Sequence, residues 1–234
     1  MKAFPEASVI RMDSDTTTRK GSHFRLLNTF REGKADILVG TQMIAKGLDV
    51  PNVTLVGVVS ADTALHMPDF RAAERTFQLL TQVSGRAGRG SVPGEVVVQT
   101  FSPDHYAIEA AAQQNYPAFY EQEIAFREEL GYPPFSRLVN IVSSDPVSEY
   151  AEEKLGELAQ GIRERISGES VEILGPATAP LSKLKGLYRW HLLLKDRSQA
   201  ADNGLQRIIR AALDEMPSSA KTGLILDVDP LSML

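Results

Sequence analysis

Cysteine is absent from this sequence of 234 residues. Without thiols the chain can form neither a disulfide nor a thiolate zinc site, which fits a reducing compartment. The few histidines also lack the spacing of a metal site, since they stand apart at His23, His66, His105 and His191. We therefore expect no metal to be bound by this chain alone.

Long hydrophobic runs are also missing. The longest lies around residues 53–59 and is far too short to span a bilayer. The opening five residues lack the apolar segment of a signal peptide. We expect a cytoplasmic protein that does not associate with a membrane.

A strong positive charge is absent as well. The formal net charge is −5, so any binding to nucleic acid must come from local basic patches rather than from the field of the whole protein. Hydrophobic residues make up 43% of the chain, which is enough for the core of one large domain or two smaller ones.

The sequence contains no loop that would cradle the phosphates of a nucleotide. No G-x-x-x-x-G-K-[ST] pattern occurs, and Gly33-Lys34 is followed by Ala35-Asp36 rather than by a hydroxyl residue. No apolar strand ends in an acidic pair that could hold Mg²⁺. We therefore expect the chain to have no ATPase activity of its own.

Residues 82–90 nevertheless carry side chains suited to sensing phosphate. Gln82, Arg86 and Arg89 recur at i, i+4 and i+7, which places them on one face of a helix. Two guanidiniums beside glycines suit a phosphate chain whose negative charge grows during transfer. The alternative is a solvated basic helix end, with arginine placed against the helix dipole.

A second motif follows the apolar strand expected at residues 36–41. In parallel sheets ligands gather at the carboxyl ends of strands, where Gly40 and Thr41 lie, with Lys46, Gly47 and Asp49 in the loop beyond them. Thr41 and the glycine amides can donate to a phosphate, and Asp49 can accept from a ribose hydroxyl. The alternative is that Gly47 and Asp49 only form a turn before a proline.

The hydrophobic pattern of the first part predicts a doubly wound α/β fold. Apolar strands alternate with helices along the chain. We expect strands at 8–12, 36–41, 53–60 and 95–100, and helices at 24–33 and from Asp69 onward. The strand at 36–41 is continuously apolar, which is typical of a strand buried on both faces of a parallel sheet.

The later part of the chain has a different order of elements. Residues 103–130 have a helical pattern, and Tyr132-Pro133-Pro134-Phe135 marks the boundary after it. Beyond it the pattern is β-α-β-β-α-β, which is the ferredoxin-like arrangement. The expected strands are 138–142, 171–174, 188–194 and 224–228, and the expected helices are 148–166 and 205–216.

The most basic and aromatic stretch is residues 183–191. Lys183, Lys185 and Arg189 alternate with Tyr188 and Trp190. Interleaved cations and rings suit single-stranded DNA, whose bases stack on aromatic side chains. The alternative is a hairpin whose two aromatic residues pack on one face, with solvated lysines at its tip.

The two motifs of the first part resemble motifs V and VI of superfamily 2 helicases. The wider pattern is similar to the family of primosomal replication-restart helicases (primosomal protein N-prime, PriA), and it covers nearly the whole chain. The matching strings are Gly40–Gly47, Asp69–Arg75, Gln82–Arg89, Tyr132–Phe135, Tyr188–Trp190 and Asp227–Pro230. Apart from the resemblance, Arg71 and Arg75 beside Glu74 are equally typical of a surface charge cluster.

The resemblance implies a division of the chain into three parts. It implies a second RecA-like helicase lobe at residues 1–102, truncated at its N-terminus, a helical connector at 103–135 and a ferredoxin-like C-terminal domain at 136–234. The family is an ATP-dependent 3′-to-5′ DNA helicase that restarts stalled replication forks by assembling the primosome. We therefore expect a C-terminal fragment of such an enzyme.

The resemblance also implies roles for individual residues. Arg89 and Arg86 would be the arginine finger and its partner, with Gln82 beside the γ-phosphate. Gly47 and Asp49 would approach the nucleotide. The DNA contacts would come from Gly40, Thr41, Lys46, Lys183, Lys185, Arg189 and Trp190.

Cofactors and partners follow from the same resemblance. ATP and Mg²⁺ would bind only together with the first lobe, and zinc would belong to a part of the protein outside this chain. The partners would be DNA forks and single strands, single-strand DNA-binding protein and other primosome proteins. The protein would be a monomer associated with the nucleoid.

Two other functions stay open on the sequence alone. One is another superfamily 2 DNA translocase. The other is a non-catalytic module that docks DNA or single-strand DNA-binding protein. ATP hydrolysis by this chain alone would separate the enzyme from the docking module.

Overall fold

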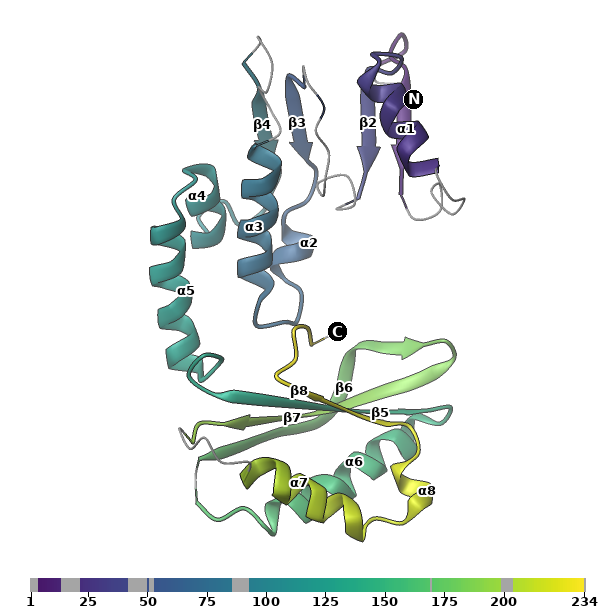
Figure 1. Cartoon of the computed structure of the whole chain (residues 1–234), viewed down its shortest axis with the longest axis vertical. Helices are drawn as coiled ribbons and strands as arrows, with labels where there is room; N and C mark the ends of the chain where they lie inside the picture. The colour runs from purple at the N-terminus through teal and green to yellow at the C-terminus, as the bar shows by residue number, and fades with distance from the viewer. Residues whose placement is uncertain are drawn as a thin grey trace. The chain divides into compact units, whose positions relative to one another are not determined.

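A computed structural model of the chain describes residues 4–13, 22–41, 50, 53–85, 93–168, 170–198 and 204–233. The chain forms two compact units (Figure 1). The first unit comprises Met1–His66 and Ala73–Phe119, and the second comprises Met67–Ala72 and Tyr120–Leu234. The short segment Met67–Ala72 therefore belongs to the second unit although the chain on both sides of it belongs to the first.

The first unit begins with a parallel strand pair. Strand β1 (Val9–Met12) pairs with β2 (Ile37–Gly40), with Met12 opposite Gly40. Helix α1 (Ser22–Arg31) connects them and packs Leu27 against Met12. The carboxylate of Asp36 accepts hydrogen bonds from the amide and hydroxyl of Ser8, and these bonds hold its pKa below the usual range.

A second parallel pair lies further along the first unit. Strands β3 (Leu55–Val58) and β4 (Glu95–Val98) run parallel. Around them lie α2 (Asp62–Leu65), α3 (Ala72–Ser84), α4 (Tyr106–Ala112) and the start of α5 (Tyr116–Leu130). Phe77 of α3 stacks on Phe119, with ring centroids 4.3 Å apart, and this contact lies in the main core of the unit.

The expectation that the strand at 36–41 is buried on both faces is wrong. Ile37 and Leu38 are only partly buried, and Val39 is 51% exposed. Strands β3 and β4 alternate between exposed and partly buried residues. Within the described residues each parallel sheet has two strands.

Helix α3 begins three residues later than the sequence pattern predicts. The carboxylate of Asp69 accepts from the amide of Arg71, and its carbonyl accepts from the amide of Ala72. These bonds close a turn ahead of the helix, because aspartate competes for nearby backbone donors and favours positions before a helix.

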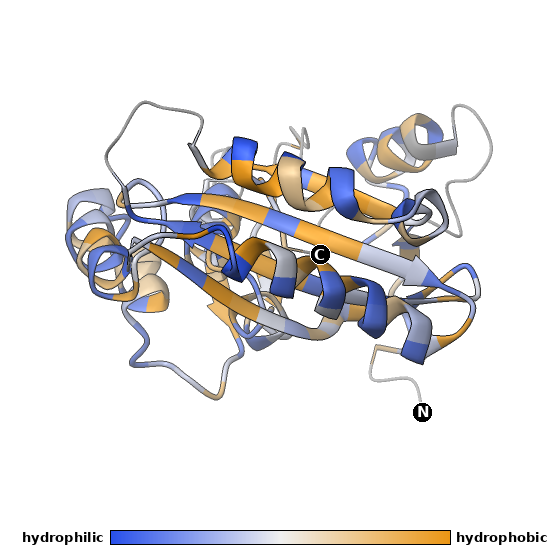
Figure 2. Ribbon diagram, turned by 90° about the horizontal axis from the view of Figure 1, so that it is seen from below, coloured by the Kyte–Doolittle hydropathy of each residue, from blue (hydrophilic) through white to orange (hydrophobic). Residues whose placement is uncertain are grey.

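The second unit is an antiparallel sheet with helices on one side. Its elements are β5 (Arg137–Asp145), α6 (Ser148–Arg163), β6 (Val171–Leu184), β7 (Leu187–Asp196), α7 (Gly204–Glu215), α8 (Ser218–Lys221) and β8 (Leu224–Val228). The strand order is β6-β7-β5-β8. Figures 1 and 2 show α6 and α7 against the same face, with hydrophobic and hydrophilic stretches alternating along them.

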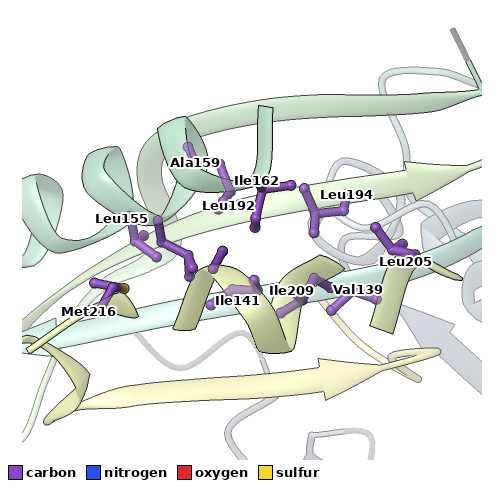
Figure 3. Packing of buried hydrophobic residues seen from close by; sticks show 12 residues of the cluster. Val139, Ile141, Leu155, Ala159, Ile162, Leu192, Leu194, Leu205, Ile209 and Met216 are labelled. Carbon is purple, nitrogen blue, oxygen red and sulfur yellow. The ribbon is translucent and has the colours of Figure 1, made fainter. Parts of the chain in front are cut away.

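The core of the second unit lies between that sheet face and the two helices (Figure 3). Leu155, Leu158 and Ile162 recur at helical spacing on α6 and are fully buried. They meet alternate residues of the central strands and one face of α7, namely Val139, Ile141, Leu192, Leu194, Leu205 and Ile209. Among the described helices none is long and apolar enough to cross a membrane.

Strands β6 and β7 extend further than the sequence pattern predicts and meet in a tight turn. Leu184 pairs with Leu187, which leaves Lys185 and Gly186 as the two loop residues. Their φ angles are 51° and 85°. Positive φ at both positions is the geometry of the type I′ turn, whose twist matches that of the strands it joins.

Gly223 offers a test of the packing at the edge of the sheet. Its φ is +83°, and a Cβ added there would lie 2.3 Å from the carbonyl oxygen of Ser144. At Gly168 φ is +98°, and beyond its chain neighbours no atom of the described residues lies within 4 Å of an added Cβ. We expect Gly168→Ala to cost about 1–2 kcal/mol of unfolding free energy for the left-handed backbone alone. Gly223→Ala should cost clearly more, because the strand backbone cannot move aside.

Urea unfolding of the two variants and the wild-type chain measures these costs. Equal losses of stability in the two variants would show that the backbone around Ser144 yields, contrary to this expectation.

Candidate nucleotide and nucleic-acid sites

Helix α3 positions the first candidate site. Its face with Phe77, Leu80 and Val83 is buried in the first unit, so the direction of the helix is fixed by packing. Gln82 lies half-buried in the last turn. The hydroxyl of Ser84 donates to the carbonyl of Leu80. The side chain predicted beside the γ-phosphate thus sits on a well-anchored helix.

The arginine motif follows directly after α3. The amide of Gly85 donates to the carbonyl of Thr81 at 3.2 Å, so the helical bonding reaches Gly85. Among the described residues, a Cβ added at Gly85 would make ordinary van der Waals contacts with the carbonyl oxygens of Thr81 and Gln82. Arg86 and Arg89 lie outside the described residues, and their placement on one face with Gln82 remains a prediction.

The second candidate motif starts at the carboxyl end of β2. Gly40 is the last residue of the strand, Thr41 follows it, and both are exposed. Asp13 directly follows β1, at the same edge of this sheet, and Arg11 donates to its carboxylate. Lys46, Gly47 and Asp49 lie outside the described residues. The sequence reasoning gave Asp13 no role, because nothing in the sequence shows that the two strands pair in this register.

The carboxyl ends of β3 and β4 bring together residues that the sequence reasoning missed. The carboxylate of Asp62 accepts from the hydroxyl of Thr100 at 3.0 Å and from the amide of Phe101 at 3.1 and 3.2 Å. These bonds fix the loop after β4, yet the side chain of Phe101 is 91% exposed. The sequence did contain a signal for this contact, because Asp62 comes soon after β3 and Thr100-Phe101 comes soon after β4.

The tip of the β6–β7 hairpin holds the basic and aromatic segment. Lys183, Lys185 and Tyr188 are exposed, and the ammonium of Lys183 lies 4.2 Å from the centroid of the Tyr188 ring. Lys183 and Tyr188 are partners in the strand register, which explains the contact. Exposed leucines accompany the lysines at the tip, namely Leu181, Leu184 and Leu187.

Arg189 and His191 follow on β7, toward the centre of the sheet. Arg189 is half-buried and donates to the carbonyl of Leu181 at 3.3 Å. Burial, together with the positive charge of Arg189, lowers the pKa of His191. His191 is therefore neutral near pH 7, so the cations of this hairpin are its lysines and Arg189.

The placement of Trp190 does not favour a role in base stacking. Its ring packs against the core of the second unit, and its indole N–H donates to the hydroxyl of Ser148 at 3.0 Å. This placement favours the packing alternative for Trp190. Trp190 is partly buried, whereas Lys183 and Lys185 are exposed, although the three are close in sequence.

Replacement of Trp190 separates packing from stacking. We expect Trp190→Ala to destabilise the chain by up to about 3 kcal/mol, because it removes a ring packed against the core. Trp190→Phe should cost about 1 kcal/mol, since it loses mainly the hydrogen bond to Ser148. Thermal unfolding followed by circular dichroism measures both. An unchanged Tm combined with a loss of about 1–3 kcal/mol in single-strand affinity would instead mark Trp190 as a stacking residue.

Comparison with known families assigns both parts of the chain. The helicase conserved C-terminal domain matches residues 2–91, and the primosomal protein N C-terminal domain matches residues 128–231. The order of the two domains is the one that the motifs in the sequence predict.

Individual relatives match along the whole chain. The replication restart protein PriA of Bacillus subtilis is 46% identical over 233 residues, which cover 100% of this chain and 29% of the relative. PriA of Synechocystis is 47% identical over 98% of this chain and 27% of the relative. PriA of Haemophilus influenzae is 43% identical over 97% of this chain and 31% of the relative. The chain thus spans about three tenths of the length of these relatives. It carries a helicase C-terminal domain followed by the C-terminal domain of primosomal protein N, and it belongs to the family of the replication restart protein PriA.

Proposed function

We propose that this chain supplies the second motor lobe and the C-terminal DNA-contacting domain of an ATP-dependent 3′-to-5′ DNA helicase that restarts stalled replication forks. The observation that carries the proposal is that the arginine motif begins at Gln82, in the last turn of α3, within the match to the helicase conserved C-terminal domain. The match to the C-terminal domain of primosomal protein N and the relatives named as replication restart proteins support DNA and the primosome as partners. Single-strand DNA-binding protein as a partner and a monomeric state belong to the same proposal.

The architecture supports the finer assignments within this proposal. Parallel strand pairs flanked by helices are what a RecA-like lobe at residues 1–102 requires. The strand order β6-β7-β5-β8, with both long helices on one face, supports a ferredoxin-like domain at 136–234. Helices α4 and α5 would form most of the connector at 103–135.

The chemistry proposed for the first unit is stabilisation of a phosphoryl-transfer transition state. Arg89 would place a planar, permanently charged fork on the transferred phosphate, and Arg86 and Gln82 would support it. The ATP phosphates would be held mainly by the first lobe of the helicase. The described residues contain no cluster of three metal ligands, so we assign neither Mg²⁺ nor zinc to them.

Substitution of Arg89 in the full-length protein tests this role. An arginine finger contributes about 10³–10⁵ in turnover, because its charge acts in a site shielded from water. We expect Arg89→Lys to lose DNA-stimulated ATP turnover nearly as severely as Arg89→Ala, since a point charge does not reproduce the fork. Steady-state phosphate release is the measurement.

DNA affinity without nucleotide is the control for this experiment, and it should stay close to that of the wild-type protein. Arg89→Lys protein that retained most of the turnover would show that Arg89 is not the finger.

The exposed hairpin tip supports a DNA contact in the second unit. Lys183 and Lys185 are exposed on a turn of fixed geometry, and Arg189 lies behind them. Lysines on a rigid hairpin can follow a phosphate backbone, and the exposed ring of Tyr188 can contact bases. The same observation favours the second candidate function, a DNA-docking module without catalysis, for the chain on its own.

Charge reversal at Lys185 tests the hairpin contact. We expect Lys185→Glu to weaken binding of a single-stranded oligonucleotide. The slope of log K against log salt concentration should become smaller in magnitude by at least about 0.7, which is the contribution of one phosphate contact. Fluorescence anisotropy over a salt series, with the full chain, measures both quantities.

Arg210→Glu is the matched control, because Arg210 is an exposed cation on α7 of the same unit. Equal losses of affinity in the two variants would mean that the net charge of the unit, rather than the hairpin, attracts the DNA.

A further inference from the structure

The tip of the β6–β7 hairpin extends beyond the strand that lies beside it. The last residue pair between β5 and β7 is Asp145 with Tyr188, whereas β6 and β7 stay paired as far as Leu184 and Leu187. Figure 1 shows this end of the ribbon standing away from β5 and β8. The tip is therefore a two-stranded projection of the second unit, and its type I′ turn gives it a fixed end.

The projecting tip carries leucine side chains that the core of the unit does not use. Leu181, Leu184 and Leu187 are 44, 46 and 37% exposed. Leu184 and Leu187 are partners in the strand register, so their side chains lie on the same face of the ribbon. Among the described residues, neither belongs to the two hydrophobic clusters of the second unit. Aliphatic side chains gathered on a projecting tip indicate contact with a partner.

The charges of the tip define the chemistry of that partner. Lys183 and Tyr188 are also register partners, and the ammonium lies 4.2 Å from the centroid of the ring. Residues 181–191 include three lysine or arginine side chains and no carboxylate. Asp145, opposite Tyr188 on β5, is paired with Lys154 at 2.7 Å, so its charge is already compensated. A matching partner combines dense negative charge with apolar surfaces.

Nucleic acid has this combination wherever its base stack is interrupted. Phosphates then lie beside the exposed apolar faces of bases. Leucine is one of the side chains that DNA-binding proteins insert between base steps. Opening a base pair costs free energy, and the cost is least where the base is mismatched or already single-stranded. An apolar, cationic ribbon tip therefore suits a junction between duplex and single strands better than a continuous duplex.

We propose that Leu184 and Leu187 form an apolar wedge that enters the base stack at a duplex–single-strand junction, while Lys183 and Lys185 hold the phosphates beside it. This inference rests on the DNA contact proposed for the hairpin. It adds a specificity to that contact, namely a preference for DNA with an interrupted base stack. The fixed turn supports this role, because a tip that yielded would not keep two bases apart.

Binding of the full chain to two DNAs tests the preference. One is a forked oligonucleotide, and the other is an intact duplex whose ends are closed by cross-links. We expect Leu184→Ala/Leu187→Ala to lose about tenfold in affinity for the fork, which corresponds to roughly 1.4 kcal/mol. Affinity for the closed duplex should not change. The salt dependence should also stay the same, because no phosphate contact is removed. Fluorescence anisotropy measures these quantities.

A fluorescent base tests the insertion directly. 2-Aminopurine in the terminal base pair of the fork emits more strongly when it is unstacked. We expect the wild-type chain at saturation to raise this emission and the double alanine variant to leave it unchanged. Leu184→Ile/Leu187→Ile should raise it as the wild type does, because isoleucine keeps the apolar bulk. Saturation with protein removes any contribution from a lower affinity.

Leu174→Ala/Ile225→Ala is the matched control. It removes the same number of carbon atoms from two aliphatic residues of the same unit that are 39 and 62% exposed and lie away from the tip. Trp190 is the only tryptophan and packs where the hairpin meets the core. Its emission spectrum therefore shows whether the hairpin stays folded in each variant.

The outcomes separate the wedge from the hairpin contact on which it rests. If the double alanine variant keeps its fork affinity and the rise in emission, while Lys185→Glu weakens binding, the wedge is wrong and the contact stands. Equal losses in Lys185→Glu and Arg210→Glu would overturn the contact and the wedge with it. A loss in the control variant as large as in the tip variant would also contradict the wedge.

Discussion

Burial of one face of α3 is the constraint on which the first unit depends. Phe77 and Leu80 cannot be exposed without opening the core that α4 and the start of α5 complete. Replacing either residue by alanine would cost several kcal/mol of unfolding free energy, and the cost for a buried aromatic residue is about 3–5 kcal/mol. Because the apolar face fixes the rotation of the helix, it also fixes the side of the helix on which Gln82 lies. Packing and the candidate chemistry are therefore set by the same residues.

The periodic parts of the fold were predictable from the sequence, and the non-local contacts were not. Helix α7 and the core of the second unit follow from apolar spacing alone, and Gly40 and Thr41 were expected at the strand end where they lie. The bond between Asp69 and Met233 joins residues 164 apart, and no local pattern contains it. Burial of β2 was overestimated because a continuous apolar run does not show how many strands or helices cover it.

Trp190 illustrates a limit of motif reading. Interleaved cations and rings describe a stacking surface and a packed hairpin equally well, since alternation along a strand sends neighbours to opposite faces. Trp190 faces the helices and Ser148, whereas Lys183 and Tyr188 lie further out, near the turn. Tyr188 and Trp190 lie two residues apart on β7 and therefore share a face, so what decides between the two interpretations is how far each lies from the turn at Lys185-Gly186: Trp190 reaches the core and Tyr188 does not.

The charge distribution of the second unit would limit the DNA contact that we propose for its hairpin. Helix α6 exposes several carboxylates, namely Glu149, Glu152, Glu153 and Glu157. At a distance these acidic groups offset the basic tip, and the net charge of the chain adds to the repulsion. Only phosphates within about a Debye length of the lysines, roughly 8–10 Å, feel a net attraction. A contact of this kind is short-ranged and weak by itself, so it would discriminate by position, engaging DNA that another part of the protein has already brought close.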